Sequence, residues 1–336
     1  MGYQVEPAEY GETKIGPGAL NSLPRIAILI PCFNEELTIA QVIDRFRAEL
    51  PEARIYVFDN NSTDRTVERA RDNGATILHE RRQGKGFVVQ RMFREINADI
   101  YVMVDGDGTY PAASVHALLE PVMINDADMV IGSRLDPASQ SQFGMMNRLG
   151  NHFFLFLTRV LFDVHIKDML SGYRVFSPNI VKQLPLRSSG FEIETELTIK
   201  ALERGYRVIE CPVHLSNRPE GSYSKIRHVH DGLLILKMIF SLARDYKPLT
   251  VFGTIGLLFV AASLIPGTIV VREFLRTGLI SQLPSVVLAA TLALSGLISG
   301  MVGLVLHTIA RRFQELDLQM RVLGREVSDV NRENGK

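Results

Sequence analysis

Two aspartates flank one glycine in Asp105-Gly106-Asp107, directly after the apolar run 100–104. At the end of a strand, two carboxylates beside one small residue can both turn toward a hard cation such as Mg²⁺ or Mn²⁺. Such an ion would neutralise a diphosphate and help it to leave. An Asp-Gly pair is also typical of an ordinary turn, so the triplet needs support from other residues.

Other polar side chains follow neighbouring apolar runs. Pro31 and Glu35 come at the end of the run that begins at Ile26, and Asp59 follows the run 55–58. Asp59 is placed to accept hydrogen bonds from a nucleobase or ribose. The segment 81–86 (Arg-Arg-Gln-Gly-Lys-Gly) adds cations and flexible backbone suited to an anionic ligand. By itself such a segment is more often a solvated loop.

The elements that must position these residues alternate along the chain. Helices are expected at 65–73, about 87–97 and 153–162, and the region 143–215 is otherwise irregular. Apolar runs predict strands at 26–30, 55–58, 76–78, 100–104 and 129–132. This βαβ alternation predicts an α/β fold, a mostly parallel sheet with helices on both faces. Because ligands bind beyond the carboxyl ends of such strands, Asp59 and Asp105 should share one rim.

The C-terminal third differs in composition. Residues 226–247 predict an amphipathic helix at a membrane interface, with Lys and Arg among its leucines. Residues 249–271 carry no charge, and a second uncharged stretch is most apolar at 286–306. Each is long enough to cross a hydrocarbon core of roughly 30 Å. Two buried helices of a soluble core are the alternative, which small residues such as Gly296 and Gly300 disfavour.

Lys and Arg are frequent before the first span and after the second and scarce between them, which predicts that both termini and the soluble domain are cytoplasmic. We expect an integral protein of a prokaryotic plasma membrane, with no signal peptide in 1–24. The predicted organisation is an N-terminal extension (1–24), a catalytic domain (25–225), an interfacial helix (226–247), a transmembrane hairpin (248–310) and a cytoplasmic tail (311–336).

The bulk composition restricts partners only weakly. Lys plus Arg and Asp plus Glu both number 37, so net charge offers no argument for nucleic acid as a partner. The two cysteines, Cys32 and Cys211, are too few for a disulfide framework and lack metal-ligand spacing. Small residues in the second span would allow a homo-oligomer.

Taken together, a set of motifs between 25 and 225 resembles family 2 glycosyltransferases with the glycosyltransferase-A (Rossmann-like) fold. More narrowly, the chain is similar to polyprenyl-phosphate glycosyltransferases, the group that includes dolichol-phosphate mannose synthase. The motifs are Ile30–Glu35, Phe58–Asp64, Gly84–Gly86, Val104–Asp107, Gly132–Arg134, Asp168–Arg174 and Phe191–Glu194.

This resemblance implies roles for individual residues. Asp105 and Asp107 would hold the divalent cation and the donor diphosphate, and Glu194 would be a catalytic or supporting acid. The nucleotide sugar would be bound by Pro31, Glu35, Asp59, Asn60, Lys85, Asp105 and Gly106. The acceptor phosphate would be bound by Arg134, Arg218, Ser224 and Lys225.

Three features depart from the family pattern. Asn60 and Asn61 replace the second acid and the glycine of the usual Asp-Asp-Gly-Ser turn. Thr109 stands where many relatives carry Gln near the metal, and the loop 218–225 is one residue longer than the usual Arg-x-x-Gly-x-Ser-Lys. The change at 60–61 affects recognition of the base, and Thr109 affects one ligand position of the metal. The longer loop affects the contacts with the acceptor phosphate.

The predicted activity is inverting transfer of a hexose from a nucleotide-diphosphate sugar to undecaprenyl or dolichyl phosphate. A UDP-sugar is favoured over GDP-mannose, although nothing in the turn at 59–64 separates UDP from GDP. A lipid monophosphate has a second pKa near 6 and needs no general base, so the protein must chiefly position two anions and neutralise their charge. A polysaccharide or glycerolipid acceptor is the alternative, and a sugar hydroxyl would require Glu194 or Asp168 as base. A catalytically silent anchoring subunit is the third hypothesis.

Overall fold

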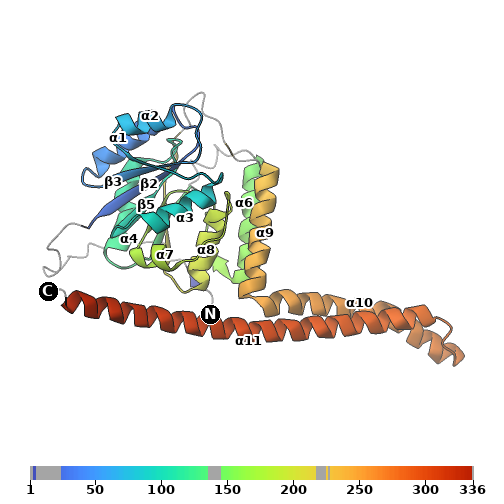
Figure 1. The fold of residues 1–336 in the computed structure, drawn as a ribbon. Helices are drawn as coiled ribbons and strands as arrows, with labels where there is room; N and C mark the ends of the chain where they lie inside the picture. Colours follow the sequence, from blue (N-terminus) through green and yellow to red (C-terminus); the bar gives the residue numbers. More distant parts are fainter. Residues whose placement is uncertain (1–2, 5–23, 135–144, 217–224, 226–227, 335–336) are drawn as a thin grey trace. The chain divides into compact units, whose positions relative to one another are not determined.

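A computed structural model describes residues 3–4, 24–134, 145–216, 225 and 228–334 (Figure 1). The chain divides into two compact units, Met1–Ile239 and Phe240–Lys336. The first contains the motifs, and the second contains two long apolar helices.

Seven strands of the described residues form the sheet of the first unit, in the order β4-β3-β2-β5-β8-β6-β9. All neighbours pair in parallel except β8, which is antiparallel to β5 and β6. The strand bounds are β2 Ile26–Cys32, β3 Arg54–Asp59, β4 Thr76–His79, β5 Ile100–Met103, β6 Met129–Ser133, β8 Arg174–Phe176 and β9 Val208–Pro212. A separate short pair joins β1 (Tyr3–Gln4) to β7 (Val164–His165). The predicted mostly parallel sheet is confirmed.

Helices cover both faces of this sheet (Figure 1). Alternate residues of β2 point to opposite faces, so Ile28 and Ile30 join the core beneath α1, α2 and α4, while Leu29 faces the side on which α3 contacts β2 and β3. The helix bounds are α1 Ile39–Glu49, α2 Thr66–Asp72, α3 Lys85–Glu95, η1 Ala112–Ser114, α4 Val115–Met123, α6 Met145–Phe162, α7 Pro178–Gln183 and α8 Ile193–Glu203.

Several details differ from the expected elements. Pro31 lies within β2 rather than after it; the pairing with β5 stops at Leu29, so the missing N–H of Pro31 is not needed there. The region expected to be irregular contains β8 and β9, and α3 begins at Lys85 instead of about Phe87.

The second unit contains an antiparallel pair of helices. A helix that begins in the first unit, α9 (His228–Tyr246), precedes α10 (Pro248–Thr277) and α11 (Leu283–Asn334). A Cβ on Gly296 would lie 2.6 Å from Gly256 O, so glycine lets the two backbones approach closely. Ser299 Oγ also donates a 2.8 Å hydrogen bond to Phe252 O.

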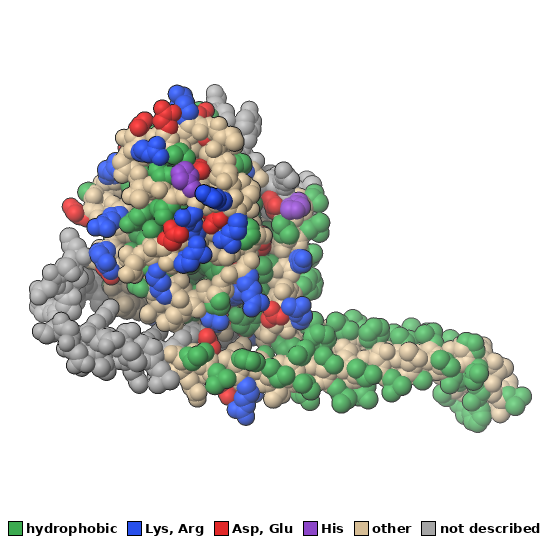
Figure 2. All heavy atoms as spheres, in the orientation of Figure 1, with side chains coloured by type: hydrophobic (Ala, Val, Ile, Leu, Met, Phe, Trp, Pro, Cys, Tyr) green, Lys and Arg blue, Asp and Glu red, His purple; other side chains and the backbone are tan. Residues whose placement is uncertain are grey.

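Both of these helices are long and apolar enough to cross a membrane, α10 over its full length and α11 up to Met320. Only 11% of the most apolar window of each is buried, which disfavours the alternative of buried core helices. Figure 2 shows hydrophobic side chains along their surfaces. These helices indicate attachment to a membrane.

Candidate active site

The Asp105-Gly106-Asp107 motif lies just beyond β5, against the end of β2. Thr38 Oγ1 donates a 2.6 Å hydrogen bond to Gly106 O. A Cβ at position 106 would lie 2.7 Å from Cys32 Sγ, so only glycine lets the motif lie this close to β2. Sequence reasoning missed Thr38, because its contact joins residues far apart in the chain.

The thiol of Cys32 lies among the predicted carboxylates. Burial raises the pKa of this thiol, and the negative charges of Glu35, Asp59 and Asp105 raise it further. Because β3 and β5 both pair in parallel with β2, Asp59 and Asp105 lie on the same rim, as predicted.

Lys85 joins two carboxylates from distant parts of the chain. Its Nζ lies 2.5 Å from Asp105 Oδ1 and 2.6 Å from Glu194 Oε1. Burial alone would lower the pKa of Lys85, but these two carboxylates hold it above its usual range. Burial raises the pKa of Glu194, an effect that the charge of Lys85 opposes. The structure thus brings three predicted site residues together in one ion-pair chain.

The glycines beside Lys85 pack closely on the backbone of Ser188 and Ser189. A Cβ on Gly84 would lie 2.1 Å from Ser189 O, and one on Gly86 would lie 2.1 Å from Ser188 O. Gly86 N also donates a 3.0 Å hydrogen bond to Ser189 O. The glycines therefore allow the start of α3 to pack directly on the backbone before α8.

Asp107 is fixed by the residue that departs from the family pattern. Thr109 donates to Asp107 Oδ1 through its backbone N at 3.1 Å and its hydroxyl at 2.7 Å. Thr109 thus orients the carboxylate through its own hydroxyl.

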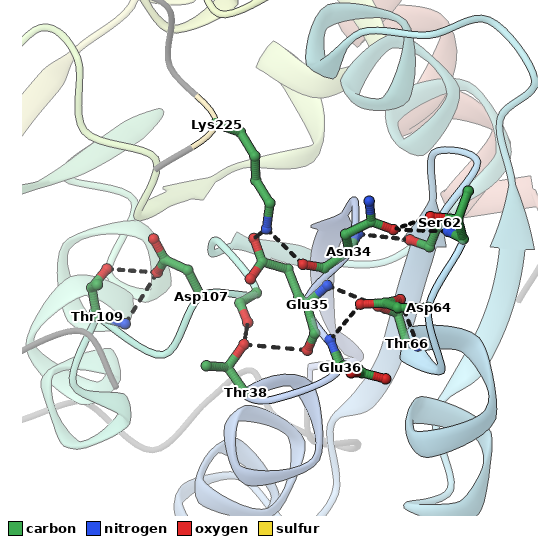
Figure 3. Close-up of polar contacts among 12 residues, drawn as sticks. Asn34, Glu35, Glu36, Thr38, Ser62, Asp64, Thr66, Asp107, Thr109 and Lys225 are labelled. Carbon is green, nitrogen blue, oxygen red and sulfur yellow. Dashed lines mark hydrogen bonds and ion pairs between the residues drawn. The ribbon is translucent and has the colours of Figure 1, made fainter. Parts of the chain in front are cut away.

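The turn after β2 is bonded to the turn after β3 (Figure 3). Asn34 N donates to Ser62 Oγ at 2.9 Å, and Glu35 N donates to Thr66 Oγ1 at 2.8 Å. Lys225 forms an ion pair with Glu35 and donates a 2.7 Å hydrogen bond to Asn34 O. Lys225, predicted to bind the acceptor phosphate, is therefore in contact with Glu35, predicted to bind the nucleotide sugar.

Asn60 is nearly buried, and its amide serves the protein itself. Its Nδ2 donates to Glu80 O at 3.0 Å and to Arg82 O at 2.8 Å, and its Oδ1 accepts from Gly84 N at 2.7 Å. These bonds attach the loop before α3 to the end of β3. The structure therefore gives Asn60 a positioning role for that loop.

Arg134, at the end of β6, is held by a buried partner. Asp168 accepts from Arg134 Nε at 2.7 Å, from Nη2 at 2.9 Å and from the backbone N at 3.0 Å. Burial alone would raise the pKa of Asp168, but Arg134 holds it below its usual range. Asp105 is among the charges that raise the pKa of Arg134, so this cation is near the Asp-Gly-Asp motif.

A second buried arginine ends the motif Asp168–Arg174 but was given no role from the sequence. Arg174 in β8 is fully buried and donates to Ser171 O, Met169 O and Thr198 Oγ1, each at 2.8 Å. Burial lowers its pKa to about 10. Arg174 holds the segment between Asp168 and Gly172 in place. In the sequence, the sign of this role was a charged residue next to apolar residues of a strand.

Two predicted acceptor residues, Arg218 and Ser224, lie outside the described residues. Of the remaining predictions, Pro31 lies at the end of β2 opposite Phe58 of β3.

The protein supplies only some of the oxygen ligands that a divalent cation needs. This is expected where the phosphates of a bound substrate supply the rest. No group of three or more His, Cys, Asp or Glu within the described ranges could hold a metal. Asp105 Oδ2, however, accepts no hydrogen bond from a described residue, and Gly172 leaves space beside it, since a Cβ there would lie 2.4 Å away. Mg²⁺ is often bound by one or two carboxylates with substrate phosphates completing its shell. Asp105 and Asp107 fit that pattern.

This arrangement, a mostly parallel sheet with an Asp-Gly-Asp motif and cations on one rim, defines a glycosyltransferase of the glycosyltransferase-A type. The family described as Glycosyl transferase family 2 matches residues 27–184. Glycosyltransferase AglJ of Haloferax volcanii is 35% identical over 243 residues, which are 71% of this chain and 78% of AglJ. The chain therefore belongs to glycosyltransferase family 2, and the membership predicted from its motifs is confirmed.

One further relative and two solved structures of another protein are also similar to this chain. Undecaprenyl-phosphate mannosyltransferase of Micrococcus luteus is 27% identical over 214 residues, 59% of this chain and 86% of that protein. Glucosyl-3-phosphoglycerate synthase of Mycobacterium tuberculosis in complex with UDP has a similar fold, with a TM-score of 0.56, 21% identity and coverage of 66% and 80%. Its complex with Mn²⁺, UDP-glucose and phosphoglyceric acid gives a TM-score of 0.50, 22% identity and coverage of 67% and 78%.

Proposed function

We propose that this enzyme transfers a hexose, with inversion, from a nucleotide-diphosphate sugar to a polyprenyl phosphate at the cytoplasmic face of a membrane. The name of the Micrococcus relative supports the acceptor, and the apolar helices α10 and α11 support a lipid-bound substrate. Mn²⁺ and UDP-glucose in the mycobacterial neighbour support a UDP-sugar and a divalent cation.

The observation that carries the choice of acceptor is the state of the two candidate bases. Asp168 is fully buried and bonded to Arg134, and Glu194 is 3% exposed and paired with Lys85. Neither carboxylate is presented as a base for a sugar hydroxyl. A phosphate acceptor needs none, since its oxygen is already anionic at neutral pH.

The residues then divide between the two anionic substrates. The nucleotide sugar is bound with its nucleoside toward Asp59 and Asn60. The other residues of this donor site are Pro31, Glu35, Lys85, Asp105 and Gly106. Arg134, Lys225 and the loop with Arg218 and Ser224 receive the acceptor phosphate. A divalent cation held by Asp105 and Asp107 would neutralise the departing diphosphate.

The test supplies radiolabelled nucleotide sugars with undecaprenyl or dolichyl phosphate and measures label in the organic phase. Arg134→Gln should reduce transfer by about 10²–10³-fold, in the range for loss of one charge-stabilising group. Arg25→Gln is the matched control, because Arg25 forms a similar two-pronged pair with Asp99 on the surface. Label that appears only in a glycan or glycerolipid would contradict the proposed acceptor.

A further inference from the structure

Asp59 lies on the rim, but its side chain, which was expected to bind a base there, is buried. Its side chain is 5% exposed. Oδ1 accepts a 3.1 Å hydrogen bond from Ser62 N, and Oδ2 lies 3.1 Å from Nδ1 of His79. Both oxygens therefore already have partners within the protein.

His79 occupies the exposed position beside Asp59. It ends β4, and the parallel pairing of β3 with β4 places the two residues in register. Its side chain is 57% exposed, and Nε2 is hydrogen-bonded to no described residue. His79 thus presents a polar atom at this end of the rim.

The contact with Asp59 also determines what His79 can offer. A carboxylate only accepts hydrogen bonds, so Nδ1 carries the proton and Nε2 of the neutral ring becomes an acceptor. Uracil and guanine present a ring N–H on their pairing edge, whereas cytosine and adenine do not. An Nε2 acceptor therefore suits the first two bases.

The topology sets the separation between His79 and the Asp105-Gly106-Asp107 motif. The order β4-β3-β2-β5 separates their strand ends by three strand spacings, about 14 Å at 4.8 Å each. A nucleoside diphosphate can extend over this distance, with its base at β4 and its diphosphate at β5.

We infer that His79 recognises the donor nucleobase by accepting a hydrogen bond from a ring N–H, and that Asp59 acts as a positioning residue for His79. The inference rests on the proposed function, whose donor it narrows to a nucleotide of uracil or guanine. Asp59 then influences base selection by fixing the tautomer and orientation of the imidazole.

Calorimetric titration of the full chain in detergent with Mn²⁺ and with UDP, GDP, CDP or ADP tests this role. The wild type should bind UDP or GDP about tenfold more tightly than CDP and ADP, as expected for one hydrogen bond. His79→Phe retains a flat ring but no acceptor, so the preferred nucleotide should fall to the affinity of CDP while CDP binding stays unchanged. The selectivity ratio separates recognition from a general structural effect.

His116→Phe is the matched control, because His116 is 58% exposed and lies 3.1 Å from Glu49 in a comparable pair. Unchanged selectivity in His79→Phe, equal losses for all four nucleotides, or a wild type that prefers CDP or ADP would each overturn the inference. If the nucleotide selectivity contradicts the role of His79 while the wild type still transfers sugar to lipid phosphate, the proposed function stands. If the wild type binds no nucleotide, both are wrong.

A double-mutant cycle then examines Asp59. If Asp59 acts through His79, Asp59→Asn combined with His79→Phe should weaken binding of the preferred nucleotide no more than the more damaging single change. Additive losses would place Asp59 itself on the base and overturn its positioning role.

Discussion

The ammonium group of Lys85 lies 2.5 Å from Oδ1 of Asp105, one of the two carboxylates proposed to hold a divalent cation. The same ammonium group contacts Glu194, so Lys85 pairs with Asp105 on the rim and with a buried carboxylate. If a divalent cation binds Asp105, Lys85 still has the buried Glu194 as its ion-pair partner.

This relationship predicts a strong effect of Lys85 on stability. The two side chains are 11% and 4% exposed, so Lys85→Met should leave Glu194 buried without its partner and lower the free energy of unfolding by about 3–5 kcal/mol. Adding Glu194→Gln should restore at least half of that loss, because the uncompensated charge is removed. Denaturant unfolding of the purified protein measures both, and a double variant no more stable than Lys85→Met would argue against the pair.

Thr109 should affect metal affinity through Asp107. Thr109→Val removes the 2.7 Å hydroxyl contact with Asp107 Oδ1 while retaining the side-chain shape. We expect Mn²⁺ affinity in the presence of nucleotide to fall about 10–100-fold, as for other groups that orient metal ligands. Thr109→Ser retains the hydroxyl and should bind nearly as the wild type does; an equal loss in both variants would indicate that the methyl group matters instead.

Gly172 should tolerate no side chain beside Asp105. In Gly172→Ala the new Cβ would lie 2.4 Å from Asp105 Oδ2, so the carboxylate must move and transfer should fall by at least about 10²-fold. Gly150→Ala is the control, because nothing lies within 4 Å of its Cβ position. Wild-type turnover in Gly172→Ala would show that the position of Asp105 is not critical.

Asp168 should contribute a pH-dependent part of the stability. Arg134 holds the pKa of Asp168 below its unfolded value of about 3.9, so the stabilisation is complete above that value and is lost as the pH falls through the lower folded pKa. The melting temperature of the wild type should therefore fall more steeply between about pH 4 and pH 2 than that of Asp168→Asn. Asp99→Asn, in an exposed pair, should retain the wild-type slope; parallel curves for wild type and Asp168→Asn would contradict the prediction.

The α10–α11 pair offers two glycines of the same helix with different environments. Gly296→Leu would force apart backbones that meet at Gly256, whereas nothing lies within 4 Å of a Cβ on Gly300. The first change should lower the melting temperature in detergent by several degrees, and Gly300→Leu should change it little. Equal effects would mean that the close approach does not stabilise the pair.

The sequence revealed the parts of this fold that rest on local patterns. The runs that form β2, β3, β5 and β6 were recognisable because strands buried on both faces are continuously apolar. The short β8 contains Arg174 and β9 contains Glu210 and Pro212, so neither has that pattern. Their place in the sheet depends on long-range pairing.

The candidate site shows the same division. Asp105 and Asp107 were identified by type and by their position after a strand, and Arg134 by the resemblance to the family. His79 and Thr38 acquire their significance only from contacts with residues distant in sequence. Asp168 was named from the sequence, but its pairing with Arg134 is seen only in the structure. Gly84 and Gly86 were recognised as important, but the reason is a backbone that approaches from about a hundred residues later.

That approach has a consequence for the design of inhibitors. With two backbone carbonyls packed against the start of α3, the wall that carries Lys85 cannot adjust to a ligand by small shifts of a loop. A compound aimed at this ammonium must match a preset distance, and a linker that is one bond too long or too short should be rejected. The same rigidity means that an amine-directed contact, once correctly spaced, requires little ordering of the protein.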